Sequence, residues 1–296
     1  MIDLVLPVPA PFHFRDVVFS HGWLYLLPFR WNAETGTLSR AERLPSGRPA
    51  QLQLSGAPGG VRLRSDAPEA HAPALVERVR WMLALDEEFS EFHALCAGEP
   101  GLRHAAGRGQ GRILRSPTVW EDVVKTLFSV NTTWGQTVGM TRNLVELCGE
   151  PHAAGDRCFP EPAAVAAVPV DDLQRVCRVG YRAEPLSRLA RGIVEGRIDL
   201  EGLKDRSLPT AEVEARLRAL RGIGPYAAAN VLMLLGHYDH LPVDSWFRDT
   251  VRGAWFGGRE THDRDLVAAF DRFRPYRTLV YRFYDWNGSA AHPESA

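Results

Sequence analysis

The stretch LRGIGPYAAANVLMLLGHYDHLPVDSW, Leu220 to Trp246, decides the fold of this chain. It contains two glycines separated by one residue, then a run rich in alanine and leucine, then Pro-Val-Asp. This order predicts a tight turn between two helices, followed by a carboxylate, Asp244, at the start of a third helix. Exposed backbone amides coupled to one carboxylate suggest chemistry on DNA.

The two helices around the turn follow from the spacing of apolar residues. The segment Ala211 to Leu220 has apolar residues at helical intervals, and Gly222 stands where a left-handed residue would end that helix. Pro225 suits the first position of the next helix, Tyr226 to Leu235, because its missing N–H would have no partner there. The second helix is apolar nearly all round, so we expect it in the core.

The turn itself, Gly222-Ile223-Gly224, has two interpretations. Glycine amides and the helix N-terminus that follows them form a site for an anion such as a backbone phosphate. An ordinary turn between two helices uses the same glycines, so the motif alone leaves the choice open.

Asp244 also has two possible roles. It precedes a helix predicted over Ser245 to Arg252, where its side chain would accept N–H bonds from about Trp246 and Phe247. Those bonds favour the ionised carboxylate. A plain helix cap is the commoner role for such an aspartate, and a catalytic carboxylate is the alternative.

Together these motifs resemble the signature of the helix-hairpin-helix (HhH-GPD) DNA glycosylases. Two upstream segments resemble the same family in the same order. Ser116 to Glu150 looks like its helix, Asn-containing loop and following helix, and Val179 to Ile193 looks like its Gly-Tyr-Arg-Ala segment. An additional N-terminal domain points to the branch that contains the alkylpurine (3-methyladenine) and 8-oxoguanine glycosylases. The resemblance implies an α+β fold, in which an N-terminal antiparallel β-sheet domain precedes a mainly helical, two-lobed glycosylase core.

The predicted domains are residues 1–104 and 105–296, with the Gly-rich segment Ala105 to Gly111 as the linker. In the first domain, short apolar runs predict strands and intervening turn residues predict reversals. The strands are expected at Val17 to Phe19, Trp23 to Phe29, Gln51 to Leu54 and Val61 to Arg64, the reversals at Asn32 to Gly36 and Ala57 to Gly60, and helices at Pro73 to Leu85 and Glu87 to Cys96.

Composition limits the function classes. The formal charge of −1 over 296 residues argues against a broad basic surface that coats DNA, but it allows local phosphate contacts through amides and arginines. There is no apolar run long enough to cross a membrane, and Met1 to Pro9 lacks the basic flank of a signal peptide. We therefore expect a soluble cytoplasmic monomer, associated with the nucleoid if the source is bacterial.

The four cysteines argue against a metal cofactor. Cys96, Cys148, Cys158 and Cys177 are scattered, whereas an iron–sulfur loop or a zinc ribbon needs a tight cluster. We expect free thiols, no iron–sulfur cluster and no required cofactor. The resemblance does imply one structural ion: main-chain carbonyls near Arg218, Leu220 and Ile223 would hold Na⁺ or K⁺ at the hairpin.

The resemblance also assigns chemical roles. Asp244 matches the family's catalytic aspartate, which stabilises the positive charge that develops on the sugar as the N-glycosidic bond breaks. Asn131 matches the residue that wedges into the duplex when the damaged nucleotide is flipped out, although an asparagine in a connecting turn is the alternative. Tyr226 stands where bifunctional members carry the lysine that forms a Schiff base, which implies a monofunctional enzyme.

The sequence leaves two interpretations open for the residues that would line the base pocket. The segment Arg274 to Asn287 resembles the pocket-lining C-terminal helix, with Tyr281 where 8-oxoguanine enzymes carry a glutamine. Four aromatic residues could form an electron-rich pocket that attracts a cationic alkylated purine, or could equally belong to the core: Tyr226, Trp246, Tyr281 and Trp286.

The expected function is therefore a monofunctional glycosylase of base excision repair that acts on double-stranded DNA carrying a damaged base, with an alkylated purine as the first candidate. An 8-oxoguanine or another oxidised or deaminated base is the alternative substrate. A non-catalytic protein that binds damaged DNA is the alternative function, but such a protein would not need Asp244 in register with the hairpin and with Asn131.

Overall fold

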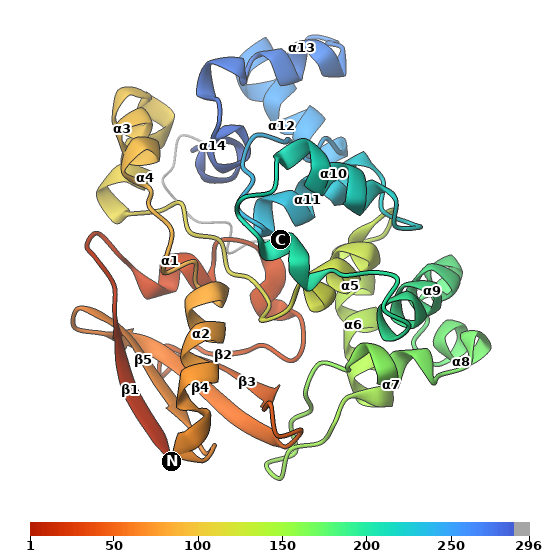
Figure 1. Cartoon of the computed structure of the whole chain (residues 1–296). Helices are drawn as coiled ribbons and strands as arrows, with labels where there is room; N and C mark the ends of the chain where they lie inside the picture. Colours follow the sequence, from red (N-terminus) through yellow and green to blue (C-terminus); the bar gives the residue numbers. More distant parts are fainter. Residues whose placement is uncertain (287–296) are drawn as a thin grey trace.

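The computed structural model describes residues 1–286 of the chain. Five antiparallel strands form one sheet in the order β1-β5-β4-β3-β2. The N-terminal strand thus lies at one edge, and the helix α2 (Ala72–Met82) lies across the sheet (Figure 1). The strands are β1 (Ile2–Pro7), β2 (Arg30–Asn32), β3 (Thr37–Arg43), β4 (Pro49–Ala57) and β5 (Gly60–Ser65).

One face of the sheet is apolar because of its register. Leu38 of β3 lies opposite Leu54 of β4, which lies opposite Leu63 of β5. All three are buried and belong to the same core as Leu75 and Val79 of α2. Alternation along each strand places these leucines on one side, so the sheet packs its apolar face against helices.

The rest of the described chain is helical. The remaining α-helices are α1 (Phe14–Val18), α3 (Ser90–Gly98), α4 (Arg103–Arg108), α5 (Val119–Ser129), α6 (Trp134–Cys148), α7 (Pro162–Ala166), α8 (Val170–Arg175), α9 (Ala183–Val194), α10 (Thr210–Arg218), α11 (Pro225–Leu234), α12 (Ser245–Phe256), α13 (Asp263–Ala268) and α14 (Arg277–Phe283). Short 3-10 helices are η1 (Gly22–Tyr25), η2 (Glu69–His71), η3 (Pro100–Leu102), η4 (Gly180–Arg182), η5 (Glu201–Lys204) and η6 (Asp271–Phe273). The α+β class expected from the sequence is confirmed.

Two hydrophobic cores hold these elements together. The first core joins the sheet, α2 and α3 to the C-terminal helices α12 to α14, and the second joins α5, α6 and α9 to α10. Helix α11 contributes Met233 and Leu234 to the first core and Val231 and Leu232 to the second. The helix after the hairpin therefore lies between the two cores, as its all-round apolar sequence predicts. The first core includes residues on both sides of the domain boundary predicted after residue 104. That boundary stays a prediction.

Two expected strands are wrong. Val17 lies in the helix α1, and the segment from Trp23 begins with the 3-10 helix η1. In α1, Val17 and Val18 are both buried together with Phe14, so this short apolar run packs as a helix. The strands at Gln51 to Leu54 and Val61 to Arg64 are confirmed as β4 and β5, and the sequence reading missed β1, β2 and β3.

The expected linker is also wrong. Ala105 is a buried residue of α4, and Gly109 ends that helix in the left-handed conformation, at φ +63°, against Pro11. The chain that follows is buried as well, because its amides find partners: Leu114 donates to Ser20 Oγ at 2.9 Å and Arg115 to the Met82 carbonyl at 2.8 Å. Paired backbone groups allow a segment without regular structure to be buried.

Candidate active site

The hairpin has the predicted form. Helix α10 ends at Arg218, and Pro225 opens α11 with Gly224 as its N-cap. Gly222 has φ +90°, and a Cβ there would lie 2.8 Å from Leu127 Cδ1 of α5, so both the conformation and the close approach require glycine. At Gly224 a Cβ would meet nothing within 4 Å.

The two glycines are exposed, whereas Ile223 between them is buried in the second core. Among residues 1–286, the N–H groups of Gly222 and Gly224 make no hydrogen bond. The buried isoleucine fixes the turn, and two free amides remain at its surface for an anion.

The carbonyl groups proposed for an ion lie around the same turn. The Leu220 carbonyl accepts the Ile223 N–H at 3.1 Å, and a carbonyl oxygen has a second lone pair for an ion. These neutral oxygen donors fit Na⁺ or K⁺, and occupancy by either ion stays a prediction.

Asp244 caps helix α12. Its Oδ1 accepts the Phe247 N–H at 2.7 Å, and its backbone is extended. Of the two donors expected, Phe247 is confirmed, and Trp246 N–H is not bonded to Asp244 within the described chain. The carboxylate is only half-buried, so one oxygen fixes the side chain while the group remains accessible.

Tyr226, in the first turn of α11, lies beside this carboxylate. Its hydroxyl has a raised pKa, because of burial first and then because of the negative charge of Asp244 and a hydrogen bond to it. A protonated phenol therefore faces the carboxylate at the position where the family resemblance places a lysine.

The three other aromatic residues predicted to line the base pocket lie in different surroundings. Tyr281 of α14 is buried, packs edge-on against Phe247 at 5.0 Å, and has a pKa raised by burial and by the charge of Asp244. Trp286 lies behind it, where its Nε1 donates to the Tyr281 carbonyl at 2.9 Å and its ring packs against Trp255. Trp246 is 69% exposed at the start of α12. Tyr226 and Tyr281 thus flank Asp244, Trp286 belongs to an aromatic core, and Trp246 faces solvent. Asn287, the last residue of the expected C-terminal helix, lies outside the described residues.

Arg282 of α14 was missed by the sequence reading. Its positive charge acts on the pKa values of both Tyr226 and Tyr281, so it lies within electrostatic reach of the two tyrosines. Its Nε is buried and has no hydrogen-bond partner among the described residues. The only sequence signal is a basic residue within an aromatic run, from Val280 to Trp286.

A second missed element comes from the N-terminal part of the chain. Gly22 lies so close to Trp134, at the start of α6, that an added Cβ would be 2.5 Å from its ring. The neighbouring His21 has a pKa lowered to about 3 by burial and by the charge of Arg282, and its Nε2 bonds the Leu114 carbonyl at 2.6 Å. A neutral histidine from the N-terminal part therefore lies near Arg282.

Asn131 lies between α5 and α6 with its side chain exposed and its backbone left-handed, at φ +47°. Arg182 supports this loop from within the protein. It is 6% exposed and donates to the carbonyls of Leu127, at 3.1 Å, of Val130 and of Asn131, at 3.3 Å. The arginine of the Gly-Tyr-Arg-Ala segment thus holds the predicted wedge loop.

Both lysines are engaged in ion pairs. Lys125 is 0% exposed, and its Nζ lies 2.6 Å from Glu121. Lys204 pairs with Glu201 at 2.7 Å and donates to the Pro117 carbonyl at 2.9 Å. Neither amine has the free, accessible character that a Schiff-base nucleophile requires.

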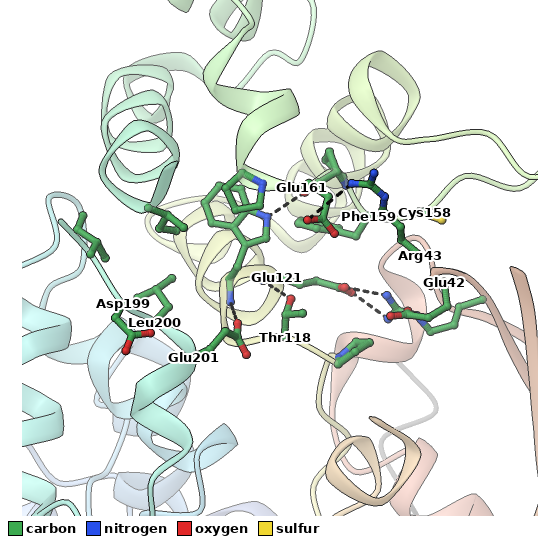
Figure 2. Close-up of a pocket in the computed structure, with 17 residues that line it drawn as sticks. Glu42, Arg43, Thr118, Glu121, Cys158, Phe159, Glu161, Asp199, Leu200 and Glu201 are labelled. Atoms are coloured by element: carbon green, nitrogen blue, oxygen red, sulfur yellow. Dashed lines mark hydrogen bonds and ion pairs between the residues drawn. The ribbon is translucent and has the colours of Figure 1, made fainter. Parts of the chain in front are cut away.

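A recess of about 230 Å³ lies elsewhere, between the sheet and α5, and contains none of the predicted site residues (Figure 2). Figure 2 shows Glu121 pointing toward an arginine of the sheet, and Arg40 is 2.8 Å from Glu121 and 2.9 Å from Glu42. Lys125 also pairs with Glu121, and Arg78 pairs with Glu42, so each buried carboxylate has two cationic partners and the network joins the sheet to α5.

The four cysteines are free, and Cys96, Cys158 and Cys177 are buried. Residues 1–286 contain no group of three His, Cys, Asp or Glu side chains placed to hold a metal ion. In the same part of the chain, no helix has both the length and the apolar character needed to cross a membrane.

No protein-family model matches the chain, and the curated proteins contain no match to its sequence. Solved structures do match. A 3-methyladenine DNA glycosylase from Archaeoglobus fulgidus has a TM-score of 0.76 at 21% identity, over 95% of this chain and 97% of that one. An 8-oxoguanine glycosylase/lyase from Clostridium acetobutylicum has a TM-score of 0.73 at 18% identity, over 93% of this chain and 92% of that one.

A 3-methyladenine DNA glycosylase from Schizosaccharomyces pombe, in complex with abasic DNA, matches over 70% of this chain and 100% of its own, with a TM-score of 0.54 at 17% identity. The A. fulgidus and C. acetobutylicum structures thus align over nearly the whole of this chain, whereas the S. pombe structure aligns over 70% of it. The chain has the helix-hairpin-helix (HhH-GPD) DNA glycosylase fold, of the form that 3-methyladenine and 8-oxoguanine glycosylases share.

Proposed function

We propose that this chain is a monofunctional DNA glycosylase of base excision repair. The observation that carries the proposal is the half-buried Asp244 carboxylate, which is fixed by one helix-cap bond and lies beside Tyr226. A helix cap needs neither an accessible carboxylate nor an aromatic hydroxyl next to it. The shared fold with DNA glycosylases supports the same conclusion.

Asp244 supplies the electrostatic part of the reaction. Breaking the N-glycosidic bond leaves positive charge on the sugar, and a fixed carboxylate beneath the ring stabilises that charge and orients the attacking water. The bond from Phe247 N–H to Oδ1 holds the carboxylate in place. The group is thus oriented before the substrate arrives.

Tyr226 supports a monofunctional reaction. A lyase step needs an amine that attacks the sugar, and here a phenol hydroxyl takes that position while Lys125 and Lys204 are held in ion pairs. The product would be a free base and an intact strand that carries an abasic site.

The partner is double-stranded DNA that contains a damaged base. The free amides of Gly222 and Gly224 would bind a backbone phosphate, and the exposed Asn131 would fill the gap left by the flipped nucleotide. Several structures with this fold were determined with DNA, among them the C. acetobutylicum enzyme with cytosine opposite 8-oxoG and the S. pombe enzyme with abasic DNA. A monomer that acts in the cytoplasm without a required cofactor is part of the proposal.

A panel of duplexes, each with one damaged base, tests this function. The panel includes alkylated purines, the first candidates from the sequence, and oxidised and deaminated bases. The wild-type protein should release free base from at least one duplex and leave an alkali-labile site. Tight binding to a damaged duplex without release of any base would instead favour the non-catalytic alternative.

A further inference from the structure

We propose that Arg277 is a positioning residue for the proposed glycosylase reaction. It binds the segment of chain that leads to Asp244, and it thereby holds the carboxylate in a fixed place relative to helix α14. This inference rests on the proposed function and adds to it a residue that acts through the backbone rather than on the substrate.

The segment between α11 and α12 carries Asp244 but has little backbone structure of its own. From Tyr238 to Val243, a single backbone hydrogen bond within the segment is found in the described part of the chain, from the Val243 N–H to the Leu241 carbonyl at 3.1 Å. Because each unrestrained residue keeps its backbone freedom, the position of the segment depends on contacts with other elements.

Helix α14 supplies such contacts from its first turn. Arg277 is 8% exposed; its Nε donates to the Asp239 carbonyl at 3.2 Å and to Asp239 Oδ1 at 2.7 Å, and its Nη2 donates to the same carbonyl. The neighbouring Thr278 donates its N–H to the Tyr238 carbonyl at 2.8 Å and its hydroxyl to the His240 carbonyl. Two consecutive residues of α14 thus bind three consecutive carbonyls, at residues 238–240.

The Arg277 guanidinium is itself held in place. Its Nη1 donates to Asp271 Oδ1 at 3.0 Å, so all three nitrogens of the guanidinium have an acceptor. The planar donor set therefore binds the carbonyl and the carboxylate of Asp239 from one fixed orientation, and charge-assisted bonds of this kind are stronger than neutral ones. Arg277 thus clamps the segment at Asp239.

Helix α14 reaches the carboxylate by a second route. Tyr281 lies one helical turn after Arg277. Its ring packs edge-on against the Phe247 ring, with centroids 5.0 Å apart, and the Phe247 N–H donates to Asp244 Oδ1 at 2.7 Å. Asp244 is therefore linked to α14 on both sides, through its own chain back to residues 238–240 and through Phe247 to Tyr281. Loss of the first link would let the carboxylate move relative to α14.

Such a movement matters because the carboxylate acts on a charge that develops at one place. Misplacement by about 1 Å can lower a rate on the order of 100-fold. Asp244 follows the last bound carbonyl, that of His240, by four residues, so the clamp acts close to it. Binding of DNA depends instead on phosphate contacts of the hairpin, which belongs to other elements. We therefore expect loss of the clamp to slow base release at saturation and to leave affinity for DNA nearly unchanged.

The test compares the wild type with Arg277→Met and Arg277→Lys. Arg277→Met removes the charge and the donors at similar length, whereas Arg277→Lys keeps a charge beside Asp239 but loses the planar donor set. Arg274→Met is the matched control, because Arg274 pairs with the same two carboxylates, Asp239 and Asp271, from a side chain that is 53% exposed.

Single-turnover base release is measured over a range of enzyme concentrations, on the duplex of the panel from which the wild type releases base fastest. The data give a rate constant at saturation and a half-saturating concentration. An unfolded fraction raises the half-saturating concentration but leaves the saturating rate constant unchanged, so the two quantities separate positioning from fold stability. Thermal melting shows that each variant is folded at the assay temperature.

We expect Arg277→Met to lower the saturating rate constant by about ten-fold or more and to keep the half-saturating concentration within about three-fold of the wild type. Arg277→Lys should recover part of the lost rate. Arg274→Met should leave both quantities within about three-fold of the wild type.

A saturating rate constant close to that of the wild type in both Arg277 variants would overturn the inference. So would a loss seen only in the half-saturating concentration, or an equal loss of rate in Arg274→Met. Where Arg277→Met does not fold, Arg277→Lys decides in the same way. In each of these cases the wild type still releases base, so the proposed function stands. Release of no base by the wild type from any duplex would overturn both.

Discussion

The Arg182 guanidinium donates to the carbonyl oxygen of Asn131 at 3.3 Å, from beneath the loop that joins α5 to α6. Because the same guanidinium also binds the carbonyls of Leu127, in the last turn of α5, and of Val130, it ties the end of α5 to two backbone positions of that loop. It thereby supports the left-handed backbone of Asn131, a conformation that asparagine adopts more readily than most residues other than glycine. The predicted wedge is thus presented by a rigid support.

Replacing Arg182 by alanine should therefore impair base flipping more than DNA binding. The loop loses two charge-assisted bonds and the end of α5 loses a third, each worth about 1.5–3 kcal/mol. We expect base release to fall at least ten-fold while affinity for undamaged duplex stays within a few-fold. Fluorescence of 2-aminopurine next to the lesion measures flipping. Arg188→Ala, at an exposed position of α9, is the control, and an unchanged fluorescence amplitude in Arg182→Ala would show that the arginine only stabilises the fold.

The two hairpin glycines should respond differently to substitution. Gly224→Asp has space for its side chain, so the fold should persist while the new charge repels phosphate and weakens binding to damaged and undamaged duplex alike. Gly222→Ala forces a side chain into a left-handed position against Leu127, and should cost on the order of 2 kcal/mol of stability. Titrations with both duplexes and chemical denaturation separate the two effects. A loss confined to lesion-bearing DNA in Gly224→Asp would mean that the turn reads the base.

The absence of a suitable amine predicts the outcome of reductive trapping. With Tyr226 beside Asp244 and both lysines in ion pairs, borohydride should trap no covalent adduct between the wild type and damaged DNA. Strands should break only after alkali or heat. Tyr226→Lys places an amine next to the carboxylate and should give weak trapping. A strong adduct with the wild-type protein, mapped to Lys125, Lys204 or the N-terminal amine, is incompatible with a monofunctional reaction.

The buried Asp122 predicts a pH dependence of stability. Burial raises its pKa from 3.8 to about 6, although Trp23 Nε1 and Ser116 N–H both donate to Oδ1. The folded protein holds this proton more tightly than the unfolded chain. The contribution of protonated Asp122 to the free energy of unfolding is therefore fully present below about pH 3.8 and is lost as the pH rises through 6.

Asp122→Asn removes the cost of ionising this buried carboxyl at higher pH, and its amide oxygen can still accept both hydrogen bonds. Its stability relative to wild type should rise between pH 4 and 6, by up to about 3 kcal/mol, because each pKa unit is worth about 1.4 kcal/mol. Urea denaturation at several pH values measures the difference, with Asp171→Asn at an exposed position of α8 as the control. A difference that does not vary with pH would exclude Asp122 as its source.

The hairpin and the helix cap at Asp244 could be predicted because their signals are local in the sequence. Gly222, Pro225 and Asp244 each act through backbone geometry within a few residues, so the turn, the start of α11 and the start of α12 could be predicted from the sequence alone. The resemblance of the upstream segments extended that prediction to the whole fold.

Long-range contacts explain what was missed. Gly22 contacts Trp134, His21 lies near Arg282, and Val17 packs in a core that the whole N-terminal part builds. None of these neighbours is close in sequence, and a short apolar run such as the one at Val17 fits a buried helix as well as a strand. For the same reason the four aromatic residues could not be sorted into pocket and core before Trp286 was seen to pack on Trp255.

Single-turnover release of a damaged base by the wild type and by Asp244→Asn tests the central claim most directly. An amide keeps the cap bond from Phe247 N–H, so the variant should stay folded and bind DNA within a few-fold of the wild type, as Asp171→Asn should. It loses the charge that stabilises the sugar cation, and we expect release to fall on the order of 10³-fold or more. Release by Asp244→Asn within ten-fold of the wild-type rate would contradict the account and leave Asp244 as a helix cap.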